Sequence, residues 1–358
     1  MTNSPKDFDF AVYALTLPGL RVAEKIARGL PARLCLSERL KGETELEARA
    51  FSGISAFLGE NFRAYKGHVA VAATGLVVRA VAPFLGSKKD DPAVVSLGQD
   101  GKHVISLLSG HLGGGNELAK RVALITSGVP VINTATDIAE KPAVETVARD
   151  LGLAIENFAA LAPVSRELVE GSKIPVWDPG DWLMPSLAPW KDSFARLEDP
   201  GDFPGSGGKP PSPFIYADYV VRELPPGALV MRPRVLVAGM GCHRGIEFSE
   251  LKSFVDEVFG EASLSPLSLA VIATAEIRGS ESAIVKLSEA MDCPLAIQSM
   301  TALAEVETPN PSDTVFERIG VFSVCEAAAR LASRMGRLTV PKKKSKKATL
   351  AIAIMNCS

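Results

Sequence analysis

Short apolar runs alternate with amphipathic helical segments in two separate parts of the chain, and this alternation constrains the fold more than any other feature. Near the N-terminus, a predicted strand over residues 10–15 leads into a helix that ends near Gly29 and then into a second strand over residues 33–36. The order repeats over residues 69–132 and returns from Val235 to the end of the chain. Strands and helices alternating at this spacing favour a mostly parallel sheet with helices on both faces.

The length of 358 residues exceeds a usual single core, so several domains are expected. We predict two α/β domains with mostly parallel sheets, over residues 1–155 and 233–358. Residues 156–232 between them are rich in proline and contain all three tryptophans of the chain. Closely spaced tryptophans indicate a small packed module rather than a pure linker, but the pattern does not reveal its fold.

Composition excludes several classes of protein. Hydrophobic residues make up 47% and the formal net charge is -2, which argues against disorder and gives no sign of nucleic-acid or membrane binding. Five dispersed cysteines without a C-x-x-C pair fit reduced thiols, and no apolar run reaches the roughly 20 residues that cross a bilayer. The four histidines show no zinc spacing, so no metal site is predicted. We expect a soluble cytoplasmic protein.

One apolar run breaks into a glycine loop, Ser109 to Gly115, before a helix expected to begin near Asn116. Asn116 is a candidate N-cap. The glycines before it allow positive φ, and a helix start offers unpaired N–H groups, so the loop is suited to a negative ligand. Core packing does not require an imidazole here, so His111 is a candidate acid or base near neutral pH. A hydrogen bond that merely holds the loop is the open alternative.

Three loops follow predicted strands of the N-terminal domain. They are Thr74-Gly75 with Arg79 one turn later, the glycine loop, and residues 133–137. Because ligands collect beyond the carboxyl ends of parallel strands, we expect these loops to meet in one cleft. The Lys88-Lys89 pair is a solvated turn by default, or it lies beside that cleft.

The C-terminal domain carries a second glycine motif, Gly239-x-Gly241-x-x-x-Gly245. Its last spacing is one residue too long for a dinucleotide fingerprint. A tight turn and a small anion site using His243 and Arg244 are equally good interpretations. Ser323 and Glu326 form a predicted capping box. The lysine-rich run over residues 342–347 favours a solvated hairpin over a nucleic-acid tail.

Several of these segments closely resemble the cobalt-precorrin-5A hydrolase family of anaerobic cobalamin biosynthesis. Its N-terminal domain is matched by residues 75–83, 89–95, 105–117 and 134–137, and its C-terminal domain by residues 239–245, 323–328 and 348–353. The resemblance spans residues 8–155 and 234–355 and is weak between them. Gly115 stands where the family usually has alanine and Asn133 where threonine is common. Residues 276–281 replace a motif that usually contains lysine, and Arg278 is expected to supply its charge.

The resemblance implies chemistry on a cobalt-containing tetrapyrrole. The family opens the ring A lactone and releases acetaldehyde, giving cobalt-precorrin-5B. Cobalt arrives with the substrate, so no cofactor is expected. Transient contacts with other enzymes of the pathway and a homodimer are further expectations. The alternatives are a tetrapyrrole carrier without chemistry and, third, a phosphate-ester or nucleotide enzyme.

The residue roles follow from combining the loops with this resemblance. We predict His111 as the base, with Glu117 or Asp137 orienting groups, and the amides of the three loop glycines as donors to an oxyanion or carboxylate. Axial contact to cobalt is the competing role for His111. The predicted substrate-binding residues are Thr74, Gly75, Arg79, Lys88, Lys89, Ser109, Gly110, Gly113, Gly114, Gly115, Asn116, Thr134, Thr136, Gly241, His243 and Arg244.

Overall fold

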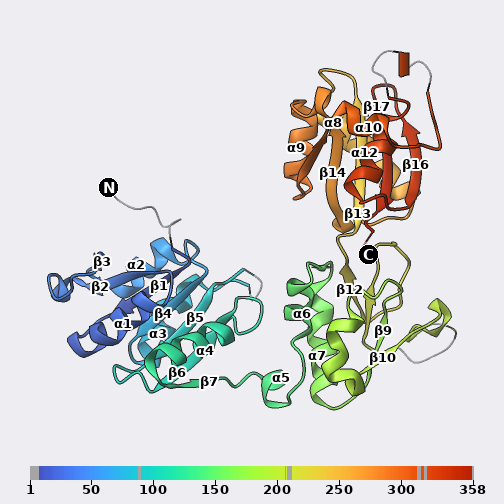
Figure 1. Ribbon diagram of the computed structural model, residues 1–358. Helices are drawn as coiled ribbons and strands as arrows, with labels where there is room; N and C mark the ends of the chain where they lie inside the picture. Colours follow the sequence, from blue (N-terminus) through green and yellow to red (C-terminus); the bar gives the residue numbers. More distant parts are fainter. Residues whose placement is uncertain are drawn as a thin grey trace. The chain divides into compact units, whose positions relative to one another are not determined.

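The structure, a computed structural model, describes residues 8–87, 90–205, 207, 212–312, 316–317 and 321–356. The chain divides into two compact units, Met1–Thr146 and Val147–Ser358. The described residues form three sheets, one in the first unit and two in the second (Figure 1). The first two are mostly parallel, and the C-terminal sheet has two parallel and two antiparallel pairings. The predicted α/β fold class is confirmed. The predicted domain limits after residues 155 and 232 remain predictions.

The first unit contains a seven-stranded sheet with the order β3-β2-β1-β4-β5-β6-β7. Its strands are β1 (Phe10–Ala14), β2 (Ala32–Ser37), β3 (Ala48–Phe51), β4 (Gly67–Val71), β5 (Ala93–Leu97), β6 (His103–Leu108) and β7 (Val129–Val131). Its helices are α1 (Leu17–Gly29), α2 (Ile54–Asn61), α3 (Thr74–Val81), α4 (Gly115–Thr126) and α5 (Ala135–Ile138), while α6 (Val144–Asp150) crosses into the second unit.

Helices cover both faces of this sheet. Leu20 of α1 and Leu118 of α4 belong to the apolar core on one face, and Val77 of α3 with Phe57 of α2 belong to the core on the other. Each core takes alternate residues of the strands, because successive side chains of a strand point to opposite faces. Val78 lies on the outer side of the short helix α3 and is 45% exposed.

The direction of β6 corrects the predicted topology. β6 pairs antiparallel with β5, with Leu97 opposite Val104 and Val94 opposite Leu108, whereas the other neighbouring strands of this sheet run parallel. The connection over residues 98–102 is too short for a parallel crossover, which needs a dozen or more residues. The carboxyl end of β6 therefore lies at the edge where β4 and β5 begin.

The second unit contains two five-stranded sheets, with the orders β10-β9-β11-β12-β8 and β15-β14-β13-β17-β16. The middle-region elements are β8 (Ala154–Ile155), α7 (Leu161–Val169), β9 (Ile174–Trp177), β10 (Phe194–Arg196), β11 (Phe214–Ala217) and β12 (Ala228–Arg232). The C-terminal elements are β13 (Leu236–Cys242), α8 (Phe248–Glu261), β14 (Leu269–Ala275), α9 (Ser282–Ala290), β15 (Leu295–Gln298), α10 (Met300–Ala304), α12 (Val324–Ala332), β16 (Leu338–Lys344) and β17 (Ala348–Ile354). Short 3-10 helices are η2 (Glu38–Leu40), η3 (Ala82–Phe84), η4 (Phe158–Ala160), η5 (Met184–Ser193), η6 (Pro200–Asp202), η7 (Pro266–Ser268) and η8 (Glu276–Arg278).

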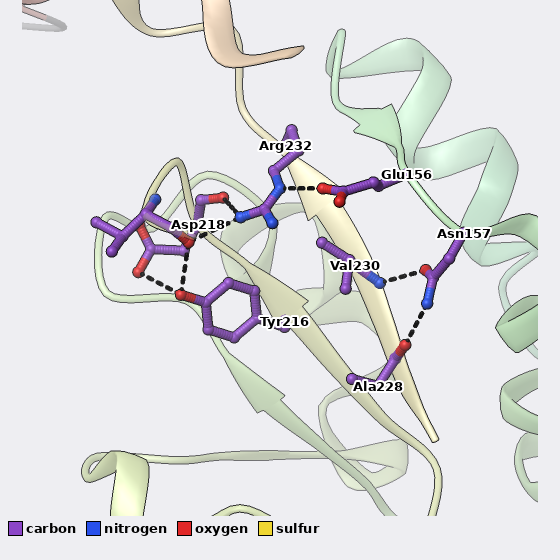
Figure 2. A network of polar contacts seen from close by, with 8 residues as sticks. Glu156, Asn157, Tyr216, Asp218, Ala228, Val230 and Arg232 are labelled. Carbon is purple, nitrogen blue, oxygen red and sulfur yellow. Dashed lines mark hydrogen bonds and ion pairs between the residues drawn. The ribbon is translucent and has the colours of Figure 1, made fainter. Parts of the chain in front are cut away.

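A buried arginine organises the proline-rich middle sheet. Arg232 is only 2% exposed, and Figure 2 shows its guanidinium between Glu156 and the turn after β11. Its Nε donates to the carboxylate of Glu156 at 2.5 Å, and its Nη1 donates to the carbonyl oxygens of Asp218 at 2.9 Å and Val220 at 2.8 Å. A buried charge is tolerated when it is paired and hydrogen-bonded in this way.

The side chain of Asn157 joins the same sheet beyond its edge strand β8. Its Nδ2 donates to the carbonyl of Ala228 at 2.7 Å, and its Oδ1 accepts from the amide of Val230 at 2.8 Å (Figure 2). The side-chain amide therefore continues the backbone pairing of β12 past the point where β8 ends. The middle region is thus a packed sheet, and its proline content marks its connections.

The C-terminal sheet has β13 at its centre, parallel to β14 and antiparallel to β17. A Cβ on Gly239 would lie 2.0 Å from the carbonyl oxygen of Cys325, so this glycine is required by the close approach of α12 to β13. Gly245 has a φ of +72°. Both observations fit the tight-turn interpretation of the glycine motif. In the described part of the chain, no helix combines the length and apolarity that a membrane span requires.

Candidate functional site

Gly113, Gly114 and Gly115, at the start of α4, are each required by a different feature of the backbone. Gly114 has a φ of +79° and occupies the N-cap position, so Asn116 is inside the helix and the predicted asparagine cap is wrong. A Cβ on Gly113 would lie 2.4 Å from the Cβ of Ser109, and one on Gly115 would lie 2.6 Å from the carbonyl oxygen of Leu108. The loop therefore needs glycine for its own packing, whatever it binds.

The amides of this loop are partly used within the loop. The N–H of Gly114 donates to the carbonyl of His111 at 2.9 Å, and the N–H of Gly115 donates to the carbonyl of Ser109 at 2.9 Å. The N–H of Asn116 donates to Gly110 at 2.9 Å. The predicted use of the Gly114 and Gly115 amides as donors to an oxyanion is therefore wrong for this conformation of the loop.

His111 lies in a polar cluster with residues of the 133–137 loop. Its Nε2 is 2.9 Å from the Oγ1 of Thr136 and 3.8 Å from the Oδ2 of Asp137. The His111 side chain is 21% exposed, so the imidazole lies at the surface of the cluster rather than in the core. The two loops meet as predicted, because β6 and β7 are parallel and their carboxyl ends share an edge.

Asn116 holds this cluster together from the first turn of α4. Its Nδ2 donates to the Oδ2 of Asp137 at 2.9 Å and to the Oγ1 of Thr134 at 3.1 Å, and its Oδ1 accepts from the hydroxyl of Ser106 at 2.7 Å. The hydroxyl of Thr134 also donates to Asp137. The carboxylate beside His111 is thereby oriented by two side chains, Asn116 and Thr134, and Ser106 in turn fixes Asn116. Sequence reasoning missed Ser106, although a hydroxyl within an apolar strand is a signal of a buried polar partner.

Thr74, Gly75 and Arg79 do not join this cluster. Thr74 follows β4, its Oγ1 is 3.1 Å from the Oγ of Ser96, and the Nη1 of Arg79 donates back to the carbonyl of Gly75 at 3.2 Å. They lie at the edge where β5 ends, so the five residues of β5 separate them from the glycine loop by about 15 Å. The expected single cleft of three loops is wrong, because β6 reverses direction.

Two further predicted groups stand apart from the cluster. Glu117 is exposed on the first turn of α4 and makes no hydrogen bond or ion pair with the described residues. Its predicted catalytic role remains a prediction without a contact to support it. Lys88 and Lys89 lie outside the described residues.

The C-terminal sheet contains a cavity of about 390 Å³ where β13 ends and α12 begins. Gly241 and His243 line it, while Arg244 is exposed and is not among the lining residues. Burial raises the pKa of the Cys242 thiol to about 11 and also raises that of Cys325, so both thiols of this cavity are protonated near neutral pH. Protonated thiols are poor nucleophiles, so the cavity is suited to binding rather than covalent chemistry.

The predicted capping box of Ser323 and Glu326 does not form, and Glu326 has another structural role. Ser323 precedes α12, but its hydroxyl makes no cap hydrogen bond, and Glu326 is fully buried. The Glu326 carboxylate accepts from Asn310 Nδ2 at 2.7 Å and from the amide of Lys342 at 3.0 Å. Burial raises the pKa of Glu326, but these hydrogen bonds outweigh that effect and lower it overall. The carboxylate therefore fastens the start of α12 to β16.

Among the described residues, no group of three or more His, Cys, Asp or Glu side chains is placed to hold a metal ion. The fold and these sites define an α/β protein with a polar histidine cluster in its first unit and a basic cavity in its second. Comparison with known proteins identifies the family to which the chain belongs.

The chain matches three family profiles in sequential order. They are described as Cobalamin synthesis G N-terminal over residues 56–137, Cobalamin biosynthesis central region over residues 142–233, and Cobalamin synthesis G C-terminus over residues 236–353. The chain belongs to the cobalamin synthesis G (CbiG) family.

Two relatives are similar over almost their whole length. The cobalt-precorrin-5A hydrolase of Priestia megaterium is 30% identical, and the match covers 97% of this chain and 95% of that protein. The cobalt-precorrin-5A hydrolase of Salmonella typhimurium strain LT2 is also 30% identical, over 93% of this chain and 94% of that protein. The crystal structure of CobE, described as a protein from the cobalamin (vitamin B12) biosynthetic pathway, is 29% identical, with a TM-score of 0.32 over 35% of this chain and 92% of that one.

Proposed function

We propose that this protein is a cobalt-precorrin-5A hydrolase. The observation that carries the proposal is the 30% identity to two enzymes of that name, over more than nine-tenths of each chain. In this proposal the enzyme opens the ring A lactone of its cobalt-tetrapyrrole substrate and releases acetaldehyde, with cobalt-precorrin-5B as product. Cobalt belongs to the substrate, and no further cofactor takes part.

The histidine cluster supports a general-base role for His111. Lactone opening needs a water molecule that loses a proton as it attacks the carbonyl carbon, and an imidazole at the rim of a loop can accept that proton. Asp137 lies 3.8 Å from Nε2 and is held by Asn116 and Thr134, so its carboxylate is placed to stabilise the imidazolium that forms. The donor for the developing oxyanion is a separate requirement.

The first test is substitution of His111. His111→Ala should lower the rate of acetaldehyde release from cobalt-precorrin-5A by roughly 10²- to 10⁴-fold, the usual contribution of a general base. Substrate binding should change little, because the Asn116–Asp137 part of the cluster does not depend on the imidazole. Acetaldehyde is measured by a coupled dehydrogenase assay, and binding by changes in substrate absorbance.

His103→Ala is the matched control, because His103 is exposed at the start of β6. Its rate should equal that of the unsubstituted protein. Full acetaldehyde release by His111→Ala would rule out the base role. Binding without acetaldehyde release by the unsubstituted protein would instead show a tetrapyrrole carrier.

A further inference from the structure

The lysine-rich hairpin of the C-terminal sheet contributes to the cavity beside α12. Six side chains around this cavity are basic, namely His243, Arg278, Lys342, Lys344, Lys346 and Lys347. No Asp or Glu is among the described residues that line it. The first turn of α12, which begins at Val324, also borders the cavity and adds the partial positive charge of a helix N-terminus.

The lysines of β16 divide between the two faces of the sheet. Lys342 and Lys344 line the cavity, whereas Lys343 pairs with Glu261 at the end of α8, with its Nζ 2.9 Å from Oε2. This alternation follows from the two-residue period of a strand. Three consecutive lysines therefore place two charges at the cavity and one on the opposite face.

The turn that carries the remaining lysines is braced. The N–H of His243 donates to the carbonyl of Lys347 at 2.8 Å, which ties the end of β13 to the turn between β16 and β17. The Oγ of Ser345 accepts from the amide of Ala348 at 3.0 Å. Lys347 is paired with Glu250 at 2.7 Å, but Lys344 and Lys346 form no ion pair with the described residues.

Arg278 is held in place by a hydrogen bond to the backbone. The Nε of Arg278 donates to the carbonyl of Cys242 at 2.8 Å, so the guanidinium is held against the end of β13. A fixed guanidinium can donate two parallel hydrogen bonds to one carboxylate, which flexible lysines cannot do. The cavity therefore combines a directional donor with mobile positive charge.

We propose that this cavity binds a carboxylate side arm of the tetrapyrrole substrate, with Arg278 as the directional donor and Lys344 and Lys346 as the main charges. The inference rests on the proposed function, because that function supplies a substrate rich in carboxylates. A volume of about 390 Å³ is near the lower end of the roughly 300–1,000 Å³ range of small-molecule sites. It is large enough to hold an acetate or propionate arm.

The test compares neighbouring lysines on opposite faces of one strand. The full-length protein with Lys344→Gln and Lys346→Gln is titrated with uroporphyrin, a porphyrin whose side arms are all carboxylates, and binding is followed by fluorescence quenching. The double variant should bind about tenfold more weakly, since each exposed charge contributes a modest amount. The same variant should raise the KM for cobalt-precorrin-5A about tenfold and leave kcat within about twofold.

Lys343→Gln is the control because it removes an adjacent charge that faces α8. Its uroporphyrin affinity and KM should match those of the unsubstituted protein. Equal weakening by Lys343→Gln, or unchanged binding in the double variant, would overturn the proposal. Thermal unfolding of each variant shows whether the hairpin remains folded. Arg278→Lys provides a second variant that keeps the charge and should still weaken binding.

Two further outcomes separate this inference from the proposed function. Weaker uroporphyrin binding in the double variant, together with no acetaldehyde release by the unsubstituted protein, would reject the hydrolase and retain the carboxylate site. Normal acetaldehyde release with unchanged KM in the double variant would retain the hydrolase and reject the site. Displacement of uroporphyrin by inorganic phosphate, but not by acetate at the same ionic strength, would identify a phosphate site and also overturn the proposal.

Discussion

At the residue scale, His68 shows how a polar side chain can belong to the core. It is 1% exposed and lies within the buried strand β4. Its Nδ1 lies 2.8 Å from the hydroxyl of Tyr13 and its Nε2 lies 2.8 Å from the carbonyl of Phe62. The hydroxyl donates to Nδ1 when Nε2–H donates to the carbonyl, so the neutral imidazole is fully hydrogen-bonded.

This environment predicts a pH-dependent contribution to stability. Burial lowers the pKa of His68 to about 4, whereas an unfolded histidine titrates near 6.5. Below pH 6.5 the unfolded state takes up the proton first, so the stabilisation is complete above about pH 6.5 and is lost as the pH falls through 4. The expected loss is about 3 kcal/mol.

Urea unfolding of the unsubstituted protein and of His68→Gln between pH 7.5 and about 4 tests this linkage. The variant should be less stable at pH 7.5 but should lose less stability on acidification. His103→Gln should keep the unsubstituted pH dependence, because His103 is exposed. Parallel stability curves for His68→Gln and the unsubstituted protein would contradict the assignment.

At the scale of elements, two glycines of the C-terminal region have different structural roles. Gly239 of β13 is required by close packing, whereas Gly260 of α8 only lowers helix propensity. A Cβ on Gly239 would meet the backbone of α12 at 2.0 Å, whereas a Cβ on Gly260 would meet nothing within 4 Å. Gly239→Ala should therefore destabilise the protein by about 3 kcal/mol or more through forced separation of α12 from β13. Gly260→Ala, near the end of α8, should stabilise it by about 0.5–1 kcal/mol.

Thermal and urea unfolding of the two alanine variants measure these effects. Both variants replace glycine by alanine in the C-terminal region. A loss of stability in one and a gain in the other would therefore show that the loss comes from the packing of α12 against β13. A stability loss below about 1 kcal/mol for Gly239→Ala would show that α12 can shift without cost.

The order of the elements could be predicted from the sequence, but the direction of one strand could not be predicted from its apolar pattern. The order of strands and helices followed from local periodicity, and helix α4 begins at Gly115, within one residue of the predicted start. The predicted direction of β6 was wrong, because the direction of a strand depends on the connection before it and not on its apolar pattern. The five-residue link over 98–102 was the available signal, since a link that short favours a hairpin.

At the scale of the whole molecule, the two compact units each have their own apolar cores. Units with separate cores usually fold alone. A cut between Glu140 and Lys141 falls between α5 and α6 and leaves both helices intact. We expect the two separated fragments to fold, each with a cooperative thermal transition.

Circular dichroism and amide dispersion in two-dimensional NMR spectra of each fragment check this expectation. An uncut chain measured under the same conditions is the control. A fragment without dispersed amide signals would show that its core needs the rest of the chain. The second fragment should also retain uroporphyrin binding if the basic cavity forms within it.

The sequence by itself determined the α/β class, most strands and helices outside residues 156–232, the family and the pairing of the glycine loop with residues 133–137, because these depend on local periodicity and on motifs short in sequence. Tertiary structure alone decided that Asn116 orients Asp137 rather than capping a helix, and that the lysines of β16 line one cavity with Arg278. Each of these joins residues through strand direction or strand pairing between distant segments. No local pattern encodes such contacts.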